Sequence, residues 1–236
     1  MTERAFDAPS TSLSVPGVRN LRDAAIGAIR PGRLYRSGHL AELTAAGADH
    51  LGRLGIRTVI DLRTSTELAV HPDRLHGLDH RLLHHPVLPD RAAGGLTWPT
   101  DQAEMYLFMP DTGAPAIADT VRRLAAPDAL PALIHCAVGK DRTGLTIAVI
   151  QSLAGAPDAD ITADFLRSNP GLGLDAGPVP YIDEHGEEHL SHPVKAAHLH
   201  AALTHIRTSH GSVPGYLRAH GVTDAELAAL RAHLHR

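Results

Sequence analysis

The sequence feature that most constrains the fold is a short apolar strand that runs directly into a tight loop and then into an apolar helix. The pattern predicts a buried strand over residues 132–135, a loop over residues 136–142 and a helix from residue 143 to about residue 154. In open α/β sheets such a loop lies at the carboxyl end of a strand, where ligands bind. This one segment therefore predicts both an α/β domain and the position of its site.

Predicted strands and helices alternate along the first part of the chain, and the last third is mainly helical. Short strands are expected around Leu21, over 34–36, over 58–62 and near residues 82–83. Helices are expected where apolar side chains recur at helical spacing, over 44–54, 114–126, 158–168, 194–208, 213–220 and 223–235. We therefore expect an α/β fold with a central, partly parallel sheet flanked by helices and a mainly helical C-terminal third.

The chain is expected to form one domain preceded by a short leader. Residues 1–14 are polar and lack periodicity, which predicts a flexible segment. Residues 15–236 follow as a single domain. Within it, residues 169–193 begin with clustered glycine and proline and continue as a charged, histidine-rich piece, which favours an exposed insertion or lid over a core element.

Charge and hydropathy exclude several classes of protein. The formal net charge is -4, so no global basic field exists to hold nucleic acid or an anionic membrane. The chain contains no run of about 18 apolar residues, so no membrane span is expected. Its polar start also lacks the apolar region of a signal peptide. The expectation is a cytoplasmic protein in which any phosphate binding is local.

A single cysteine, Cys136, excludes an intramolecular disulfide and a cysteine-based zinc site. Five residues separate it from Arg142, a spacing that lets the loop wrap around one tetrahedral phosphate. Backbone N–H groups of the loop can converge on the phosphate oxygens, and the positive end of the following helix adds to them. The predicted phosphate-binding residues are Ala137, Val138, Gly139, Lys140, Thr143 and Gly144.

The same loop carries groups suited to phosphoryl transfer. Nearby cations and a helix N-terminus favour the thiolate form of Cys136, which is the nucleophilic form. Arg142 offers a planar guanidinium that can hold two phosphate oxygens. Asp141 is the nearest candidate for the general acid that protonates the leaving oxygen. We expect no metal and no cofactor, because the loop already supplies the positive charge that a metal would provide.

The segment from His135 to Gly144 resembles the catalytic loop of the protein-tyrosine phosphatase superfamily. With a Lys-Asp pair inside the loop, it is similar specifically to the bacterial tyrosine/serine phosphatase family. Segments 20–23, 30–38, 56–63 and 211–217 also match that family's pattern, so the resemblance covers most of residues 15–235. It implies a tyrosine-phosphatase fold, metal-independent phosphatase activity, and the roles of nucleophile for Cys136, general acid for Asp141 and phosphate binding for Arg142.

The phosphorylated substrate stays open between three classes. The resemblance favours a phosphoprotein, with phosphotyrosine preferred. A phosphoinositide is the second class, because Lys140 resembles the basic loops that accept lipid headgroups. A small sugar or nucleoside phosphate is the third, because aromatic residues make up only 3% of the chain and leave few rings to stack on phosphotyrosine. An inactive phosphate-binding module is a further alternative, against which the intact Cys136, Asp141 and Arg142 argue.

Other charged residues have both a functional and a structural interpretation. Arg22 and Arg63 are possible substrate-binding residues, but each could equally be a structural ion-pair arginine. His185, His189 and His192 are loosely spaced and form no His-Glu-x-x-His pattern. Because histidine is abundant throughout the chain, a biased composition explains them better than a metal site.

Overall fold

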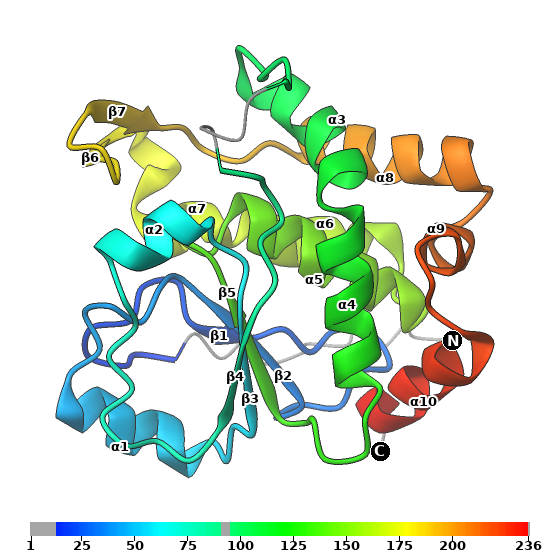
Figure 1. The fold of residues 1–236 in the computed structure, drawn as a ribbon, viewed down its shortest axis with the longest axis horizontal. Helices are drawn as coiled ribbons and strands as arrows, with labels where there is room; N and C mark the ends of the chain where they lie inside the picture. Colours follow the sequence, from blue (N-terminus) through cyan, green and yellow to red (C-terminus); the bar gives the residue numbers. More distant parts are fainter. Residues whose placement is uncertain (1–12, 91–94, 236) are drawn as a thin grey trace, which may run out of the picture.

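The computed structural model describes residues 13–90 and 95–235, so the expected leader over 1–14 falls almost entirely outside the described residues. A five-stranded sheet in the order β1-β2-β5-β3-β4 forms its centre (Figure 1). The strands are β1 (Arg22–Asp23), β2 (Leu34–Ser37), β3 (Thr58–Asp61), β4 (Arg81–His84) and β5 (Ala132–His135). Strands β2, β5, β3 and β4 run parallel, and β1 is antiparallel to β2. The expected partly parallel sheet is confirmed.

Helices cover both faces of the sheet unequally (Figure 1). Helix α1 lies against one face, and α4, α5, α6 and α8 to α10 supply the core on the other. The α-helices are α1 (Ala45–Arg53), α2 (Ser65–Val70), α3 (Gln102–Thr112), α4 (Ala114–Leu124), α5 (Asp141–Leu153), α6 (Asp158–Leu166), α7 (Ser168–Leu172), α8 (Ala196–His210), α9 (Val213–Ala219) and α10 (Asp224–His235). The mainly helical C-terminal third is also confirmed.

Neighbouring residues of the central strands face opposite sides of the sheet. Ile60 and Ile134 belong to the larger core, whereas Val59 and Leu133 belong to the core beneath α1. This alternation follows from the two-residue period of a strand. Because both faces are covered, these strands are buried along their whole length rather than at every second residue.

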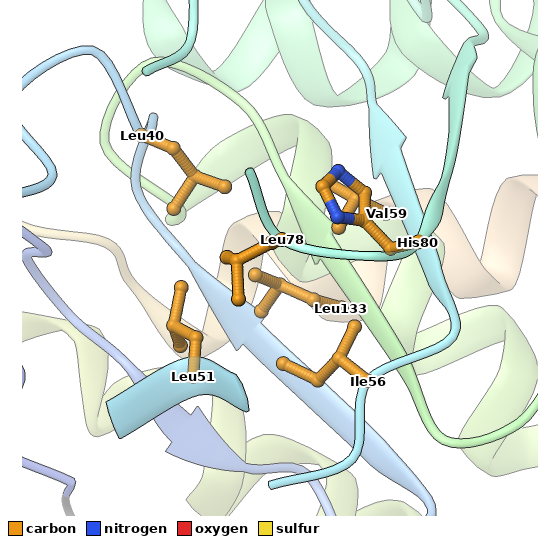
Figure 2. Close-up of a pocket in the computed structure, with 7 residues that line it drawn as sticks. All are labelled: Leu40, Leu51, Ile56, Val59, Leu78, His80 and Leu133. Atoms are coloured by element: carbon orange, nitrogen blue, oxygen red, sulfur yellow. The ribbon is translucent and has the colours of Figure 1, made fainter. Parts of the chain in front are cut away.

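The core beneath α1 is closely packed. A small void within this core measures about 10 Å³ (Figure 2). The void is lined by Leu40, Leu51, Ile56, Val59, Leu78, His80 and Leu133. A space of this size holds one water molecule at most, so it is no candidate for a ligand site.

Local signals determine where α1 begins and ends. The side chain of Thr44 accepts a hydrogen bond from the N–H of Gly47 at 3.0 Å, which satisfies a free donor of the first turn. Gly55 follows the end of the helix with a φ of 66°, in the left-handed region that glycine adopts readily. Both features agree with the helix expected over 44–54.

The apolar pattern did not predict α3. Pro110 lies inside this helix, and Leu107 is 46% exposed while Tyr106 beside it is fully buried. A proline and an apolar residue on the outer face both weaken the sequence signal for a helix. Helix α3 matters because it contributes to the site.

Residues 169–193 contain a two-stranded hairpin that projects from the body of the fold (Figure 1). Strand β6 (Val179–Ile182) pairs antiparallel with β7 (Glu188–Ser191). Both strands are largely exposed, with Ile182 at 62% and Leu190 at 55%. The function of residues 169–193 as a lid stays a prediction. Among the described helices, none is both long and apolar enough to cross a membrane.

Candidate active site

Cys136 follows directly after β5, the middle strand of the sheet, at the edge where the parallel strands end. The last residue of β5, His135, lies opposite Ser37 of β2 and Asp61 of β3. Cys136 is only 2% exposed, and its loop leads into the 13-residue helix α5. The thiol therefore lies at the base of a loop that ends at a helix N-terminus, which favours a bound anion.

The loop turns sharply at Gly139. This residue has a φ of +74°, and a Cβ placed there would lie 2.2 Å from the carbonyl oxygen of Ser37. Only glycine fits such a left-handed position in direct contact with another backbone segment. Gly139 thus lets the loop pack against the end of β2.

The Arg142 guanidinium pairs with Glu67, a residue that the sequence pattern did not single out. Nη2 donates to Oε1 of Glu67 at 2.7 Å, and Nη1 donates to Oε2. Glu67 also accepts the N–H of Thr64 at 2.8 Å in the capping box of α2. The Thr-x-x-Glu spacing of a capping box is visible in the sequence, but it does not indicate contact with an arginine 75 residues away.

Burial and charge oppose each other in this ion pair. Burial by itself would raise the pKa of Glu67, but the charge and hydrogen bonds of Arg142 outweigh it and lower that pKa to about 2. Burial would likewise lower the pKa of Arg142, and the carboxylate of Glu67 instead raises it. Both groups therefore stay ionised at neutral pH, and the guanidinium is held in one orientation.

The carboxylate of Asp141 is held by two donors from α3. Tyr106 Oη donates to Oδ1 of Asp141 at 2.8 Å, and Gln102 Nε2 donates to the same oxygen at 3.1 Å. Burial raises the pKa of Tyr106 well above its ordinary value, so this hydroxyl keeps its proton and remains a donor. Neither partner could be found from the sequence, because α3 itself was not predicted.

Lys140 connects the loop to the hairpin. Its Nζ donates to Ser191 Oγ at 3.0 Å and to the carbonyl oxygen of His192. The same nitrogen lies 3.8 Å from Oδ2 of Asp141. The segment expected to be an insertion therefore contacts the loop directly through a buried lysine.

An open cleft of about 1300 Å³ lies above these groups. The loop contributes Val138, Lys140, Asp141 and Arg142 to its walls. Further walls come from the start of α3, from both strands of the hairpin and from residues 70–72. Known small-molecule pockets measure roughly 300–1000 Å³, so this cleft can admit a larger ligand.

Comparison with known protein families shows to which family the chain belongs. Residues 13–236 match the family described as the tyrosine phosphatase family. The chain belongs to this tyrosine phosphatase family. It is therefore a phosphatase enzyme, and the resemblance seen in the sequence is confirmed.

Two curated relatives agree with this assignment. The phosphatase is 33% identical to the triple specificity protein phosphatase PtpB of Mycobacterium tuberculosis, over 93% of this chain and 98% of the relative. It is 29% identical to a tyrosine-protein phosphatase of Nostoc commune, over 88% of this chain and 76% of the relative. Among solved structures, P. aeruginosa TpbA is 21% identical with a TM-score of 0.41, over 86% of this chain and 91% of that one.

Arg63 of this phosphatase borders the cleft, but its guanidinium is already hydrogen-bonded to other residues of the protein. Its Nη2 donates to Asp61 at 2.7 Å and to Asp73 at 2.9 Å, and its Nη1 donates to the carbonyl oxygen of His71 at 2.7 Å. The residue is 1% exposed. This position allows Arg63 to stiffen the cleft wall, and direct contact with substrate stays a prediction.

Arg22 lies away from the cleft. Its Nε donates to Oδ1 of Asp164 at 3.0 Å, and its Nη2 donates to Ser168 Oγ at 3.1 Å. It is 3% exposed and is not among the described residues that line the cleft. The two-residue strand β1 directs this side chain toward α6, so the structure favours a structural ion pair over the predicted substrate contact.

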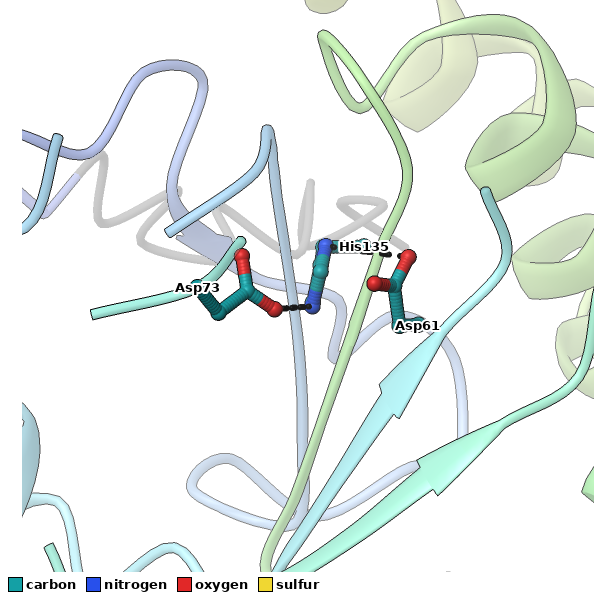
Figure 3. Close-up of side chains that lie close together, drawn as sticks. All are labelled: Asp61, Asp73 and His135. Carbon is teal, nitrogen blue, oxygen red and sulfur yellow. Dashed lines mark ion pairs between the residues drawn. The ribbon is translucent and has the colours of Figure 1, made fainter. Parts of the chain in front are cut away.

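Asp61, Asp73 and His135 form a buried cluster behind the loop (Figure 3). His135 Nε2 lies 3.1 Å from Oδ2 of Asp73, and its Nδ1 lies 3.8 Å from Oδ1 of Asp61. The donor atoms are close enough to suggest a metal site. However, Arg63 already donates to both carboxylates. The cluster thus contains its own cation and fixes the ends of β3 and β5.

Proposed function

We propose that this phosphatase hydrolyses a phosphomonoester through a phosphocysteine at Cys136. In the first step Sγ of Cys136 bonds to phosphorus, the ester P–O bond breaks, and the leaving oxygen takes the proton of Asp141. In the second step water attacks phosphorus, Asp141 takes a proton from that water, and the S–P bond breaks. Inorganic phosphate leaves, and both the thiolate and the protonated acid are restored.

The observation that supports this proposal is the position of Asp141 and Arg142, which line the cleft in the first turn of α5, while Cys136 is buried at the start of the same loop. Arginine has five N–H donors. Glu67 takes one from each Nη atom, which leaves three for phosphate oxygens. The loop amides and the helix end add further positive potential where negative charge accumulates during the reaction.

We further propose that the substrate is a phosphoprotein, with phosphotyrosine preferred. The volume of the cleft supports a large ligand, and Tyr181 of the hairpin offers a ring, 46% exposed, at its wall. Lys140, the cation that would favour a lipid headgroup, already donates to Ser191 and to the carbonyl of His192. The names of the two relatives given above also describe protein phosphatases.

The nucleophile is tested with purified Cys136→Ser. We expect turnover to be abolished while inorganic phosphate still binds, because the loop amides and Arg142 remain in place. Substantial activity in this variant would disprove the phosphocysteine. An activity of the parent that requires an added divalent metal and disappears with a chelator would also contradict it.

The substrate class is tested by comparing kcat/KM for phosphotyrosine peptides, phosphoinositides, and nucleoside or sugar phosphates. We expect the peptides to be the best substrates. A small-molecule phosphate that exceeds every peptide tested would overturn the phosphoprotein assignment and leave the chemical mechanism unaffected.

A further inference from the structure

Carbonyl oxygens of the catalytic loop are bound by side chains from distant parts of the chain. Asn20 Nδ2 donates to the carbonyl oxygen of Val138 at 3.2 Å and to that of Gly139 at 3.0 Å. Nη2 of Arg36 also donates to the Gly139 oxygen at 3.0 Å. These contacts lie on the side of the loop that faces β1 and β2.

Binding a carbonyl oxygen also determines the direction of the next N–H group. Among the described residues only the Leu130–Pro131 peptide is cis, so the loop peptides are trans. In a trans peptide the C=O and N–H of one unit point in opposite directions. When Asn20 holds the oxygens of Val138 and Gly139, the N–H groups of Gly139 and Lys140 must point away from Asn20.

The amide of Asn20 is itself held in one orientation. Its Oδ1 accepts a hydrogen bond from Nη1 of Arg22 at 2.5 Å, so its Nδ2 must face the loop. Arg22 is fixed in turn by Asp164. A Cβ at Gly171 of α7 would lie 2.6 Å from Oδ1 of Asn20, so only a glycine there leaves room for the amide.

The backbone of Asn20 also departs from the usual conformation. Its φ is 55°, in the left-handed region, which asparagine adopts more readily than most residues other than glycine. The residue is 8% exposed. Residues other than glycine keep this conformation where surrounding contacts hold them, and such positions are frequent at functional sites.

We propose that Asn20 is a positioning residue for the phosphate-binding loop. Its amide holds two carbonyls outward, so that the N–H groups of Gly139 and Lys140 face the phosphate. This inference rests on the proposed function, because it assumes that the loop binds phosphate. Arg22 acts one step further out, by fixing the orientation of the Asn20 amide.

Two variants test the proposal on the full chain, with inorganic phosphate as a competitive inhibitor of aryl phosphate hydrolysis. Asn20→Asp keeps an acceptor for Arg22 but loses both donors and sets a carboxylate against two carbonyl oxygens. Asn20→Gly also loses the donors, while glycine adopts the left-handed backbone without strain. We expect the inhibition constant of phosphate to rise in both variants by on the order of 10-fold. This factor corresponds to the free energy that one hydrogen bond to a charged group contributes.

The matched control is Asp23→Ala, three residues further along the chain. Asp23 accepts hydrogen bonds from the N–H groups of Ala25 at 2.9 Å and Gly32 at 2.6 Å, and these bonds do not involve the loop. We expect this control to lower the melting temperature and to leave phosphate inhibition unchanged.

The loss of kcat/KM in the Asn20 variants should be the same for good and poor leaving groups. A variant that lacks the general acid would instead lose more activity on substrates with poor leaving groups.

A folded Asn20→Gly with the parent's phosphate inhibition constant would overturn the positioning role. So would an increase no larger than that of Asp23→Ala, because the effect would then reflect general destabilisation. A parent protein that phosphate does not inhibit would overturn the proposed function itself, and this inference with it. The two failures are therefore distinguishable.

Discussion

Asp141 lies between hydrogen-bond donors on one side and a cation on the other. Tyr106 and Gln102 hold its Oδ1, and Nζ of Lys140 lies 3.8 Å from its Oδ2. A general acid at this position would protonate the leaving oxygen, whereas a structural carboxylate would only shape the loop. The two roles differ in how the rate depends on the leaving group.

Removing the carboxylate as Asp141→Asn should slow hydrolysis of an alkyl phosphate or a phosphotyrosine peptide by about 10²–10⁴-fold. A dinitrophenyl phosphate should be affected far less, because its phenolate leaves without a proton. The measurement is the slope of log kcat against leaving-group pKa, which we expect to be steeper in the variant. Equal slopes would place the acid elsewhere, on the segment near Asp90 or Asp101, and a matching loss of phosphate affinity would indicate a structural role.

The ionisation of Glu67 affects both the orientation of Arg142 in the site and the stability of the folded protein. Its pKa lies near 2 in the folded protein against an ordinary 4.5, although burial acts in the opposite direction, because Arg142 pairs with its carboxylate. A lowered pKa stabilises the folded state fully above the ordinary pKa, and this stabilisation is lost as pH falls toward the folded value. The difference corresponds to about 3 kcal/mol.

The variant Glu67→Gln should therefore be less stable than the parent at pH 7, with the gap closing as pH falls from about 4.5 to about 2. Urea unfolding at several pH values measures this gap. We also expect kcat/KM to fall, because the Arg142 guanidinium loses the partner that orients it. A gap that stays constant with pH would show that Glu67 is not the titrating group.

At the scale of elements, the hairpin of β6 and β7 is a largely exposed part of the cleft wall. It carries Tyr181, Ile182 and Leu190, which line the cleft while staying 46%, 62% and 55% exposed. Apolar side chains that are exposed beside an active site suit contact with a bound peptide. The hairpin should therefore affect large substrates more than small ones.

Replacing residues 180–190 by an Asn-Gly turn tests this idea. Val179 and Ser191 face each other in the strand pair, so a two-residue turn can join them and Ser191 remains to bind Lys140. We expect near-parent activity on p-nitrophenyl phosphate. For a phosphotyrosine peptide KM should rise about 10-fold, as expected for the loss of an aromatic contact worth about 1–1.5 kcal/mol. Equal effects on both substrates would argue against a role in peptide binding.

At the scale of the whole molecule, Asp164 of α6 ties the N-terminal strands to the C-terminal half. Its carboxylate accepts from Arg22 at 3.0 Å and from Arg36 at 2.8 Å. Burial would raise the pKa of Asp164, but these two arginines lower it to about 2. Because Arg36 also donates to the carbonyl of Gly139, the network reaches the loop over residues 136–142.

Asp164→Asn should destabilise the protein by about 3–5 kcal/mol, because it leaves two buried guanidinium groups without their counter-charge. Asp158→Asn on the same helix is the matched control. It removes a surface ion pair with Arg207, in which the two side chains are 51% and 36% exposed, and should cost less than about 1 kcal/mol. Urea unfolding at pH 7 compares them. Similar losses in the two variants would mean that the buried network contributes little.

The sequence by itself determined the central strand, the loop and helix α5, together with Cys136, Gly139 and Arg142. These features could be predicted because they lie within about twenty consecutive residues. Over so short a range the chain's own geometry dictates which groups meet. The cap at Thr44 and the buried strand β3 were predictable for the same local reason.

Only the tertiary structure decided which groups surround this loop. Glu67 reaches Arg142 across 75 residues, Tyr106 reaches Asp141 across 35, and Asn20 reaches Gly139 across 119. Such contacts depend on the order of the strands and on where α2, α3 and the segment before β1 lie relative to the loop. A local pattern carries no information about that packing, so Arg22 could not be assigned to the protein interior, and Glu67 could not be assigned to the site, before the fold was known.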